Sequence, residues 1–275
     1  MTSIDISSLR TSLRLAAREE LLGRFVASGI GYKADGSLVT AADFAMNSRI
    51  RTELGHLYPD TAFLSEEMSP EEQLRALESV DQDLWVLDPL DGTSNYVNGL
   101  PYFCVSLALI RNGQVLYGLV YDPNRDECFD ARLGEGAWLN GQPLGRGPQV
   151  LSLGQSIALV DFKRLPPALA SRLAATPPYA SQRSLGSVAL DFCWLAAGRV
   201  HLYLHGRHNL WDYAAGRLIL QQAGGYCLDL EGRLDPPLSL DPRSSVAALE
   251  AGLFRQWYDW LGITPPSAAR RDGNE

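Results

Sequence analysis

The chain has 275 residues, of which 46% are hydrophobic and 20% charged, and it carries a formal net charge of −8. This length is enough for a substantial buried core, in one large domain or two modest ones. The acidic balance argues against nucleic-acid binding, which draws most of its affinity from basic residues that neutralise phosphates.

The sequence also carries few signals for export or membrane insertion. No window approaches the ~18 apolar residues of a membrane span, and the polar first ten residues do not resemble a signal peptide. The four cysteines are scattered without a CxxC pair, which is typical of buried thiols in a reducing compartment. We therefore expect a cytoplasmic protein whose partners include neither a membrane nor a nucleic acid.

The first part of the chain mixes helical and strand patterns. Apolar residues at intervals of three and four predict the helices, and short apolar runs predict the strands. Asn112-Gly113 is a strong hairpin signal between two of these strands. In chain order, we expect a helix at 6–26, a polar hairpin turn at 32–37, a helix at 42–57 and strands at 61–64, 84–87, 104–110, 115–121 and 127–132.

After a Gly/Pro-rich stretch at residues 144–148 the pattern changes to alternating strands and helices. This change divides the chain into an α+β part (residues 1–148) and an α/β part (residues 149–275), which together form one compact unit. In the second part we expect strands at 157–160, 200–204, 225–230 and 246–248, and helices at 167–175, 188–197, 211–222 and 253–261.

The segment that most directly indicates chemistry is WVLDPLDGTSN, residues 85–95. An apolar strand leads into Asp88 and Asp91. Pro89 between them fixes its own φ and disfavours helix at the preceding residue. We expect the strand to end at Asp88-Pro89, and Gly92 to allow a tight turn.

Two carboxylates at this spacing suit hard divalent cations, which prefer oxygen ligands. With the carbonyl of Leu90, Asp88 and Asp91 can bind one ion or bridge two. The alternative is that Asp-Pro and Asp-Gly are ordinary turn-forming pairs.

Other acids have equally ordinary alternatives. Glu66, in the sequence Ser65-Glu66-Glu67, could lie on a solvated surface. Asp212 starts a helix, where a carboxylate is favoured by the helix dipole. Lys33, Thr40 and Asp43 could be a loop lysine and a helix cap.

Taken together and in this order, the Glu66-Glu67 pair, DPLDGTSNY and WDYAAG…AGG resemble the inositol monophosphatase family of metal-dependent phosphatases. The resemblance extends from Lys33 to Gly225 and so covers most of the chain. It implies an α+β fold of the layered α/β/α/β/α sandwich type, and a homodimer. It also implies Mg²⁺-dependent hydrolysis of a small phosphate monoester, commonly sensitive to lithium.

The resemblance further implies roles for single residues. Glu66 and Thr93 would orient the attacking water, with Asp43 nearby, and catalysis would follow a two-metal scheme in which ions clamp the attacking and leaving oxygens. The implied ligands of two or three Mg²⁺ ions are Glu66, Asp88, Asp91, Asp212 and the Leu90 carbonyl.

For the substrate, the resemblance assigns the phosphate to backbone amides at Gly92, Thr93 and Ser94, and the sugar to Gly186, Ser187 and Val188. Family members that act on inositol phosphates carry a glutamate seven residues before the Trp-Asp aspartate, where this chain has His205. Imidazole cannot supply the same paired acceptors, so this departure argues against myo-inositol 1-phosphate as the substrate. The alternative is that His205 simply lies on a partly exposed strand.

Several functions therefore stay open. An inositol monophosphate or a related sugar or polyol phosphate is favoured, because the segment after DGT is Ser-Asn-Tyr and not the Lys-Glu-Phe of the nucleotide-acting branch. The alternatives are fructose 1,6-bisphosphate, 3′-phosphoadenosine 5′-phosphate and histidinol phosphate. A non-catalytic partner of the transcription machinery is the alternative from another class.

Overall fold

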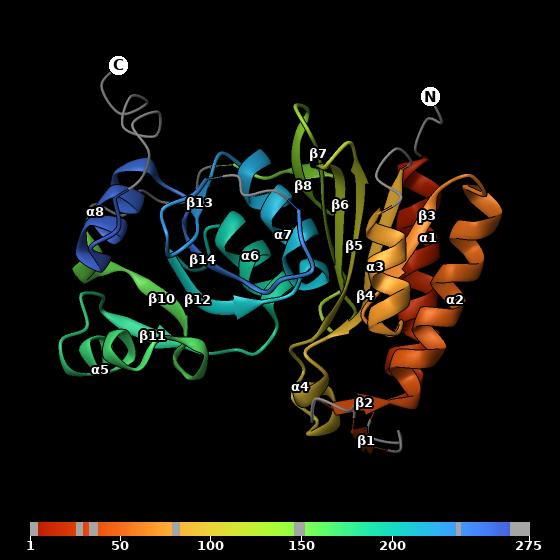
Figure 1. Cartoon of the computed structure of the whole chain (residues 1–275), viewed down its shortest axis with the longest axis horizontal. Helices are drawn as coiled ribbons and strands as arrows, with labels where there is room; N and C mark the ends of the chain where they lie inside the picture. The colour runs from red at the N-terminus through yellow and green to blue at the C-terminus, as the bar shows by residue number, and fades with distance from the viewer. Residues whose placement is uncertain are drawn as a thin grey trace.

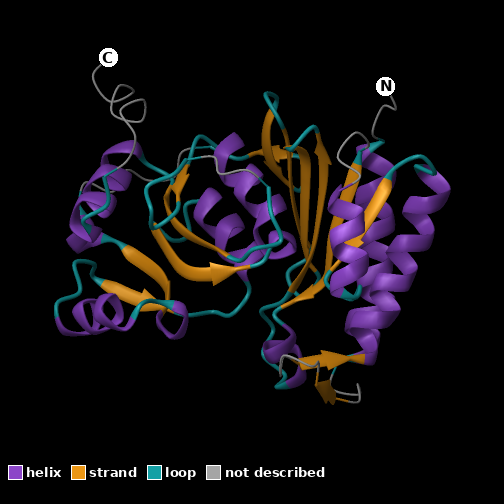
Figure 2. Ribbon diagram, viewed as in Figure 1, coloured by secondary structure: helices purple, strands orange, loops and turns teal. Residues whose placement is uncertain are grey.

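The fold is a stack of alternating helical and sheet layers, which Figure 1 shows from one end of the stack to the other and Figure 2 shows by element type. The computed structural model describes residues 5–25, 30–32, 38–78, 83–145, 152–234 and 238–264. Three clusters of buried side chains separate the layers. The predicted α/β/α/β/α sandwich is thus confirmed.

The first layer consists of α1 (Ile6–Ala16) and α2 (Ala41–Leu57). The helix predicted at residues 6–26 is confirmed as far as residue 24, because a π turn and a 3-10 turn continue α1 over residues 17–24. Thr40 and Asp43 form a capping box at the start of α2. Both helices place their apolar faces on the first sheet.

A small hairpin precedes α2. Its strands β1 (Ile30–Tyr32) and β2 (Leu38–Thr40) pair antiparallel, which agrees with the hairpin predicted at residues 32–37. Residues 33–37, including Lys33, lie outside the described residues.

The first sheet has seven strands in the order β3-β4-β5-β6-β7-β8-β9. All neighbours are antiparallel except β3 and β4, which are parallel and are joined by α3 (Pro70–Glu78), a helix that the apolar pattern did not predict. At the predicted Asn112-Gly113 turn Asn112 has a φ of 49°, and Asn140 in a second Asn-Gly turn has a φ of 50°, as a two-residue hairpin requires. The strands are β3 (Ala62–Ser65), β4 (Leu84–Asp91), β5 (Cys104–Arg111), β6 (Gln114–Asp122), β7 (Glu127–Arg132), β8 (Gly136–Leu139) and β9 (Gln142–Pro143).

The prediction that this sheet's second strand ends at Asp88-Pro89 is wrong. Strand β4 continues to Asp91, and its pairing with β5 shifts register between Asp88 and Asp91. A bulge of this kind accepts a proline, because the proline lacks an N–H and the bulged residues leave the ladder. The bulge carries both carboxylates past the end of β3, which pairs only as far as Leu87.

The central layer consists of α6 (Val188–Ala196) and α7 (Leu210–Gln222), close to the ranges predicted for them. Helix α7 packs directly on β6: a Cβ added at Gly118 would lie 2.8 Å from the carbonyl oxygen of Ala215. Such close approach requires glycine and fixes the middle of α7 relative to the first sheet.

The second sheet has the order β11-β10-β12-β14-β13. Its outer face is covered by α5 (Pro167–Ala175) and α8 (Ala251–Leu261). The predicted strands are confirmed with shifted ends, while β11 was not predicted. The strands are β10 (Ile157–Asp161), β11 (Ser181–Arg183), β12 (Leu202–His208), β13 (Tyr226–Leu228) and β14 (Arg243–Ala248).

The division into parts at residues 1–148 and 149–275 stays a prediction. The two sheets lie on either side of it, but one buried cluster joins Val86 and Phe129 of the first sheet to Phe192 and Tyr203 of the second part. The four cysteines are buried and free, as predicted. None of the helices in the described ranges combines the length and hydropathy needed to cross a bilayer.

Candidate active site

A cavity of about 760 Å³ opens where the two sheets meet the central helices. It is bordered by the ends of β3 and β4, the short helix α4 (Thr93–Val97), the ends of β10 and β12, and the starts of α6 and α7. Every described residue that the sequence singled out as catalytic, metal-binding or substrate-binding lines this cavity, except Asp43, which lies behind it.

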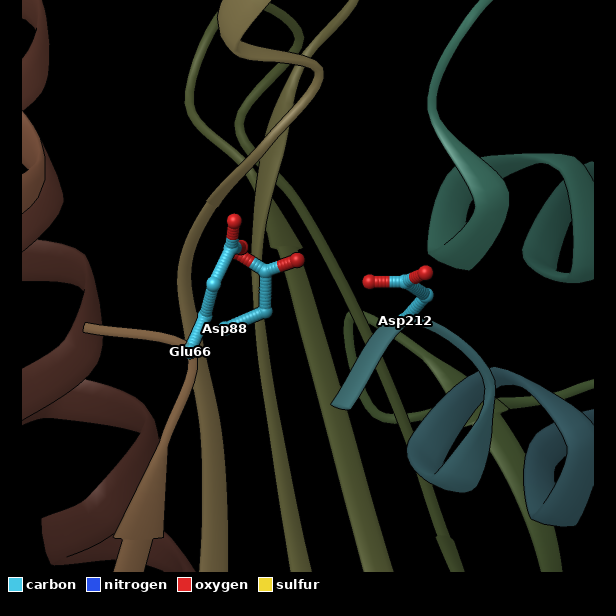
Figure 3. A group of neighbouring side chains, drawn as sticks. All are labelled: Glu66, Asp88 and Asp212. Carbon is cyan, nitrogen blue, oxygen red and sulfur yellow. The ribbon is translucent and has the colours of Figure 1, made fainter. Parts of the chain in front are cut away.

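Three carboxylates meet at the base of the cavity. One oxygen each of Glu66, Asp88 and Asp212 lies within 4.8 Å of the others. Figure 3 shows Glu66 and Asp88 side by side, with Asp212 facing them from the start of α7. The tertiary fold thus brings together Glu66 and Asp212, which are 146 positions apart in the sequence.

Backbone N–H groups hold two of these acids in place. The amide of Leu90 donates to Oδ1 of Asp88 over 3.0 Å. The amide of Asn209 donates to Oδ2 of Asp212 over 2.7 Å, within the capping box of α7. The helix-cap interpretation of Asp212 is therefore correct, and it coexists with a place in the carboxylate group.

Asp91 is held differently. Its Oδ2 accepts hydrogen bonds from the Ser187 hydroxyl and from the Ala189 amide, both at 2.7 Å. This ties the bulge of β4 to the first turn of α6. Asp91 is not part of the group of three carboxylates within 4.8 Å, although its charge acts on that group.

The acids repel one another, and Asp88 and Asp91 are also buried. Burial, and then the negative charges of Glu66, Asp91 and Asp212, raise the pKa of Asp88 well above its ordinary range. Burial and the neighbouring carboxylates likewise raise the pKa of Asp212. Burial raises the pKa of Asp91 to about 6, against the hydrogen bonds from Ser187 and Ala189.

Such a group is stabilised by a cation placed among it. The donors are all oxygens, and the carbonyl of Leu90 adds another at the cavity wall. An all-oxygen donor set suits Mg²⁺ or another hard divalent ion and not a thiophilic metal. The residues present therefore fit the ion that the sequence predicted.

A hydroxyl lies beside this group. Thr93 Oγ1 lies 3.0 Å from the Leu90 carbonyl oxygen and 3.4 Å from Oδ1 of Asp43. The other oxygen of Asp43, Oδ2, accepts from the amide and hydroxyl of Thr40 at 2.7 and 2.6 Å. Asp43 thus caps α2 and reaches the hydroxyl of Thr93 at the same time.

The start of α4 offers backbone donors to the cavity. Gly92 has a φ of 96°, and a Cβ there would lie 3.0 Å from the carbonyl oxygen of Tyr102. The amides of Thr93 and Ser94 come first in the helix, where N–H groups have no intrahelical acceptor and favour anions. Across the cavity, Gly186, Ser187 and Val188 line the opposite wall, as predicted.

His205 is buried and lines the cavity, so the interpretation as a partly exposed strand residue is wrong. Its Nε2 lies 3.1 Å from Oδ2 of Asp161, and its Nδ1 accepts from the Arg207 amide over 3.3 Å. Although burial opposes the change, the hydrogen bond from His205 lowers the pKa of Asp161.

Sequence reasoning missed Asp161, Gln73 and the anchoring role of Asn95. Asp161 and His205 are register partners on parallel strands β10 and β12; a carboxylate at the end of a predicted strand was the available signal. Gln73 donates to the carbonyl oxygens of Ser65 and Glu66 over 2.9 and 3.4 Å, for which the sequence offers no signal.

Asn95 belongs to the quoted motif, but its role appears only in the fold. Its Nδ2 donates to the carbonyl oxygens of Tyr102 and Leu185, both at 2.7 Å. These bonds link α4 to the loop that carries Gly186, so the two walls of the cavity are fixed relative to each other.

The comparisons with known proteins agree with this geometry. A family model described as the inositol monophosphatase family matches residues 3–259. The chain is 39% identical over 206 residues to "Nus factor SuhB" of Pasteurella multocida, covering 73% of this chain and 74% of that protein. It is 34% identical over 236 residues to "Inositol-1-monophosphatase" of Mesorhizobium japonicum, covering 80% and 82%.

A solved structure gives the same result for the fold. An IMPase of Thermotoga maritima, 28% identical, superposes with a TM-score of 0.77 and covers 93% of this chain and 94% of its own. The match of the family model across nearly the whole length is decisive. The chain belongs to the inositol monophosphatase family.

Proposed function

We propose that this protein is a Mg²⁺-dependent phosphatase that hydrolyses a phosphate monoester of a small polyol, an inositol monophosphate or a related sugar phosphate. The observation that carries the proposal is the convergence of Glu66, Asp88 and Asp212 within 4.8 Å at the base of the cavity. Family membership and the relative named as an inositol-1-monophosphatase support it.

In this proposal two or three Mg²⁺ ions are held by Glu66, Asp88, Asp91, Asp212 and the carbonyl of Leu90. When bound, Mg²⁺ neutralises charge on the phosphate oxygens and makes water a better nucleophile at neutral pH. The raised pKa values of Asp88 and Asp212 support this assignment, because burial and then the neighbouring carboxylates disfavour the ionised forms, which a cation would stabilise.

Protons are handled by the group behind the carboxylates. Thr93 Oγ1, between the Leu90 carbonyl and Oδ1 of Asp43, can accept a hydrogen bond from the attacking water and pass its own proton to Asp43. Glu66 orients the same water from the other side. No side chain has to form a covalent bond to phosphorus.

The phosphate is received by the amides of Thr93 and Ser94, which the turn at Gly92 exposes. For the alcohol part of the substrate, Gly186 to Val188 provide one wall and the Asp161–His205 pair the other. Because His205 holds Asp161 through Nε2, we propose that Asp161 supplies the carboxylate acceptor for polyol hydroxyls that the family places on a glutamate at position 205.

Phosphate release with Mg²⁺ and with EDTA tests the proposal. The substrates are inositol 1-phosphate, fructose 1,6-bisphosphate, 3′-phosphoadenosine 5′-phosphate and histidinol phosphate. Release that requires Mg²⁺, falls in Asp212→Asn and persists in Asp241→Asn, an exposed acid outside the cavity, supports it. Absence of release from all four substrates would contradict it. Inhibition by LiCl is expected from family membership.

A second candidate function, a regulatory partner of the transcription machinery, is favoured by the relative named "Nus factor SuhB". Expression of Asp91→Asn in cells that lack the natural gene distinguishes the regulatory function from the phosphatase function. If the variant loses the cellular role, the role depends on catalysis; if it retains the role, a purely enzymatic account is wrong. The homodimer and the cytoplasmic location stay predictions.

A further inference from the structure

Three cationic side chains gather at the mouth of the cavity: Lys163, Arg164 and Arg207. All three are exposed, and within the part of the chain that the structure describes none of their side chains forms an ion pair or hydrogen bond. Other arginines of this acidic chain are paired, among them Arg10 with Asp130 and Arg199 with Glu127. The cations at the mouth are therefore available to an anionic ligand.

The fold builds this cluster with two fixed contacts. A Cβ added at Gly206 would lie 1.9 Å from the carbonyl oxygen of Arg164, so only glycine lets β12 pass this close to the turn at residues 162–164. Asp161 ends β10, and its Oδ1 accepts from the amide of Lys163 over 3.2 Å. The backbone segments that carry Lys163, Arg164 and Arg207 are thus held together.

The cations also act on the acids that face them. Burial raises the pKa of Asp212, and the positive charge of Arg164 works against that rise. Lys163 similarly helps to lower the pKa of Asp161 against the effect of burial. The cavity is therefore polarised, with carboxylates at its base and cations at its mouth.

A substrate with one phosphate group places its negative charge at only one end of such a cavity. In the proposed function, the reacting phosphate sits at the base with the metal ions, so the three cations remain unused by a substrate with a single phosphate. The cavity, about 760 Å³, has room for a drug-sized molecule. A second anionic group on the same substrate would meet the cations, where exposed charges attract it over distances up to the Debye length.

We infer that Lys163, Arg164 and Arg207 form a second anion subsite, and that the preferred substrate carries a second phosphate besides the one that is hydrolysed. This rests on the proposed phosphatase function, and it replaces the single-phosphate substrates named there by substrates with two phosphates. The shared chemistry is a phosphate monoester with a second phosphate group, on either a sugar or a nucleoside. The hydrolysed bond is the P–O bond at the base; the second phosphate is bound and released unchanged.

Steady-state kinetics test the inference, with fructose 1,6-bisphosphate as the sugar arm, 3′-phosphoadenosine 5′-phosphate as the nucleoside arm and inositol 1-phosphate as the single-phosphate reference. The double variant Lys163→Gln/Arg207→Gln removes two exposed cations, and Arg255→Gln, exposed on α8, is the matched control. Each lost cation should lower kcat/KM for a bisphosphate at least about fourfold, because this is the change that corresponds to the Coulomb energy of two unit charges about 5 Å apart in water.

The expected result is a fall of roughly tenfold or more in the double variant's kcat/KM for a bisphosphate relative to the reference, mostly through KM. The control should keep the wild-type ratio. The arm with the higher wild-type kcat/KM identifies the sugar or the nucleoside. An unchanged ratio in the double variant for both arms overturns the subsite.

Calorimetric titration of fructose 1,6-bisphosphate and 3′-phosphoadenosine 5′-phosphate into EDTA-treated protein gives a readout without turnover. The subsite is supported if at least one bisphosphate binds more weakly to the double variant than to wild type and to Arg255→Gln. This holds even if no substrate is hydrolysed, because the absence of hydrolysis would refute only the phosphatase proposal. Equal affinities of all three proteins for both ligands overturn the subsite, while Mg²⁺-dependent turnover of inositol 1-phosphate would leave the phosphatase proposal standing.

Discussion

Ionised Asp91 should lower the folding stability of the metal-free protein at neutral pH, and a variant without this charge should show by how much. Burial raises the pKa of Asp91 from the ordinary 3.8 to about 6. The folded chain therefore binds this proton more tightly than the unfolded chain. The stability that follows is complete below pH 3.8 and is lost as the pH rises through about 6.

The magnitude follows from the pKa difference. At pH values above both 3.8 and 6, the ionised Asp91 costs about 3 kcal/mol of folding free energy relative to the protonated form. Between pH 4.5 and pH 8 the loss amounts to about 2 kcal/mol. Asp91→Asn abolishes this loss while an amide oxygen can still accept from Ser187 and Ala189. The raised pKa values of Asp88 and Asp212 act in the same direction.

The assay is urea unfolding of wild type and Asp91→Asn in EDTA at pH 4.5 and pH 8. Only the difference between the two proteins is used, because titrating groups remote from Asp91 cancel in it, while Asp88 and Asp212, whose pKa values the Asp91 charge raises, add to it in the same direction. We expect the difference to move by about 2 kcal/mol in favour of the variant as the pH rises. With Mg²⁺ at pH 8, wild type should gain more stability than the variant.

Asp83→Asn provides a control of opposite sign. The hydrogen bond from Arg111 lowers the pKa of Asp83, so its ionised form contributes stability above pH 3.8 that is lost as the pH falls through the lowered value. Asp83→Asn should be less stable than wild type at pH 8, and its stability relative to wild type should not increase as the pH rises. A difference between Asp91→Asn and wild type that is independent of pH would refute the electrostatic reasoning.

Three further predictions test the site and its support. Asp212→Asn should lower kcat/KM about a thousandfold or more, since electrostatic stabilisation is usually the largest catalytic contribution; near-normal turnover would exclude Asp212 as a metal ligand. Thr93→Val should lower kcat about a hundredfold, because it removes the hydroxyl near Asp43, whereas Thr93→Ser should retain most of it. Gly118→Ala should destabilise the fold by about 1–3 kcal/mol in urea unfolding, because its Cβ would lie 2.8 Å from the Ala215 carbonyl oxygen; an unchanged midpoint would mean that α7 can move away from β6.

The sequence allowed the main elements and the acidic residues of the site to be predicted, because both depend on local patterns. Glu66 follows the end of β3, Asp212 stands in the first turn of α7, and Asp88 lies at the bulge of β4 beside Pro89. Such positions can be located from periodicity and turn residues. The family resemblance supplied the step that local patterns lack, namely that these ends meet.

Contacts that depend on strand register could not be predicted in the same way. The pairing of Asp161 with His205 requires β10 and β12 to be parallel neighbours in a particular register, although β11 lies between them in the sequence. The continuation of β4 to Asp91 depends on a bulge against β5. Proline chemistry alone indicated a strand end, and the pairing partner overrode it.

Three acids of the site are held in place by backbone hydrogen bonds. Asp88, Asp91 and Asp212 each commit one oxygen to a main-chain N–H, donated by Leu90, Ala189 and Asn209 respectively. Two of these donors belong to the first turn or the cap of α6 and α7, where the helix dipole favours negative charge.

Backbone hydrogen bonds of this kind fix the positions of like-charged carboxylates without neutralising them. An arginine at the base would neutralise the carboxylates and compete with a metal ion, whereas a backbone N–H fixes the geometry and leaves the net negative charge in place. It also makes the asparagine variants informative. The amide oxygen of an asparagine can accept the same backbone hydrogen bond, so a loss of Mg²⁺ dependence in such a variant reports the missing charge and not a collapsed site.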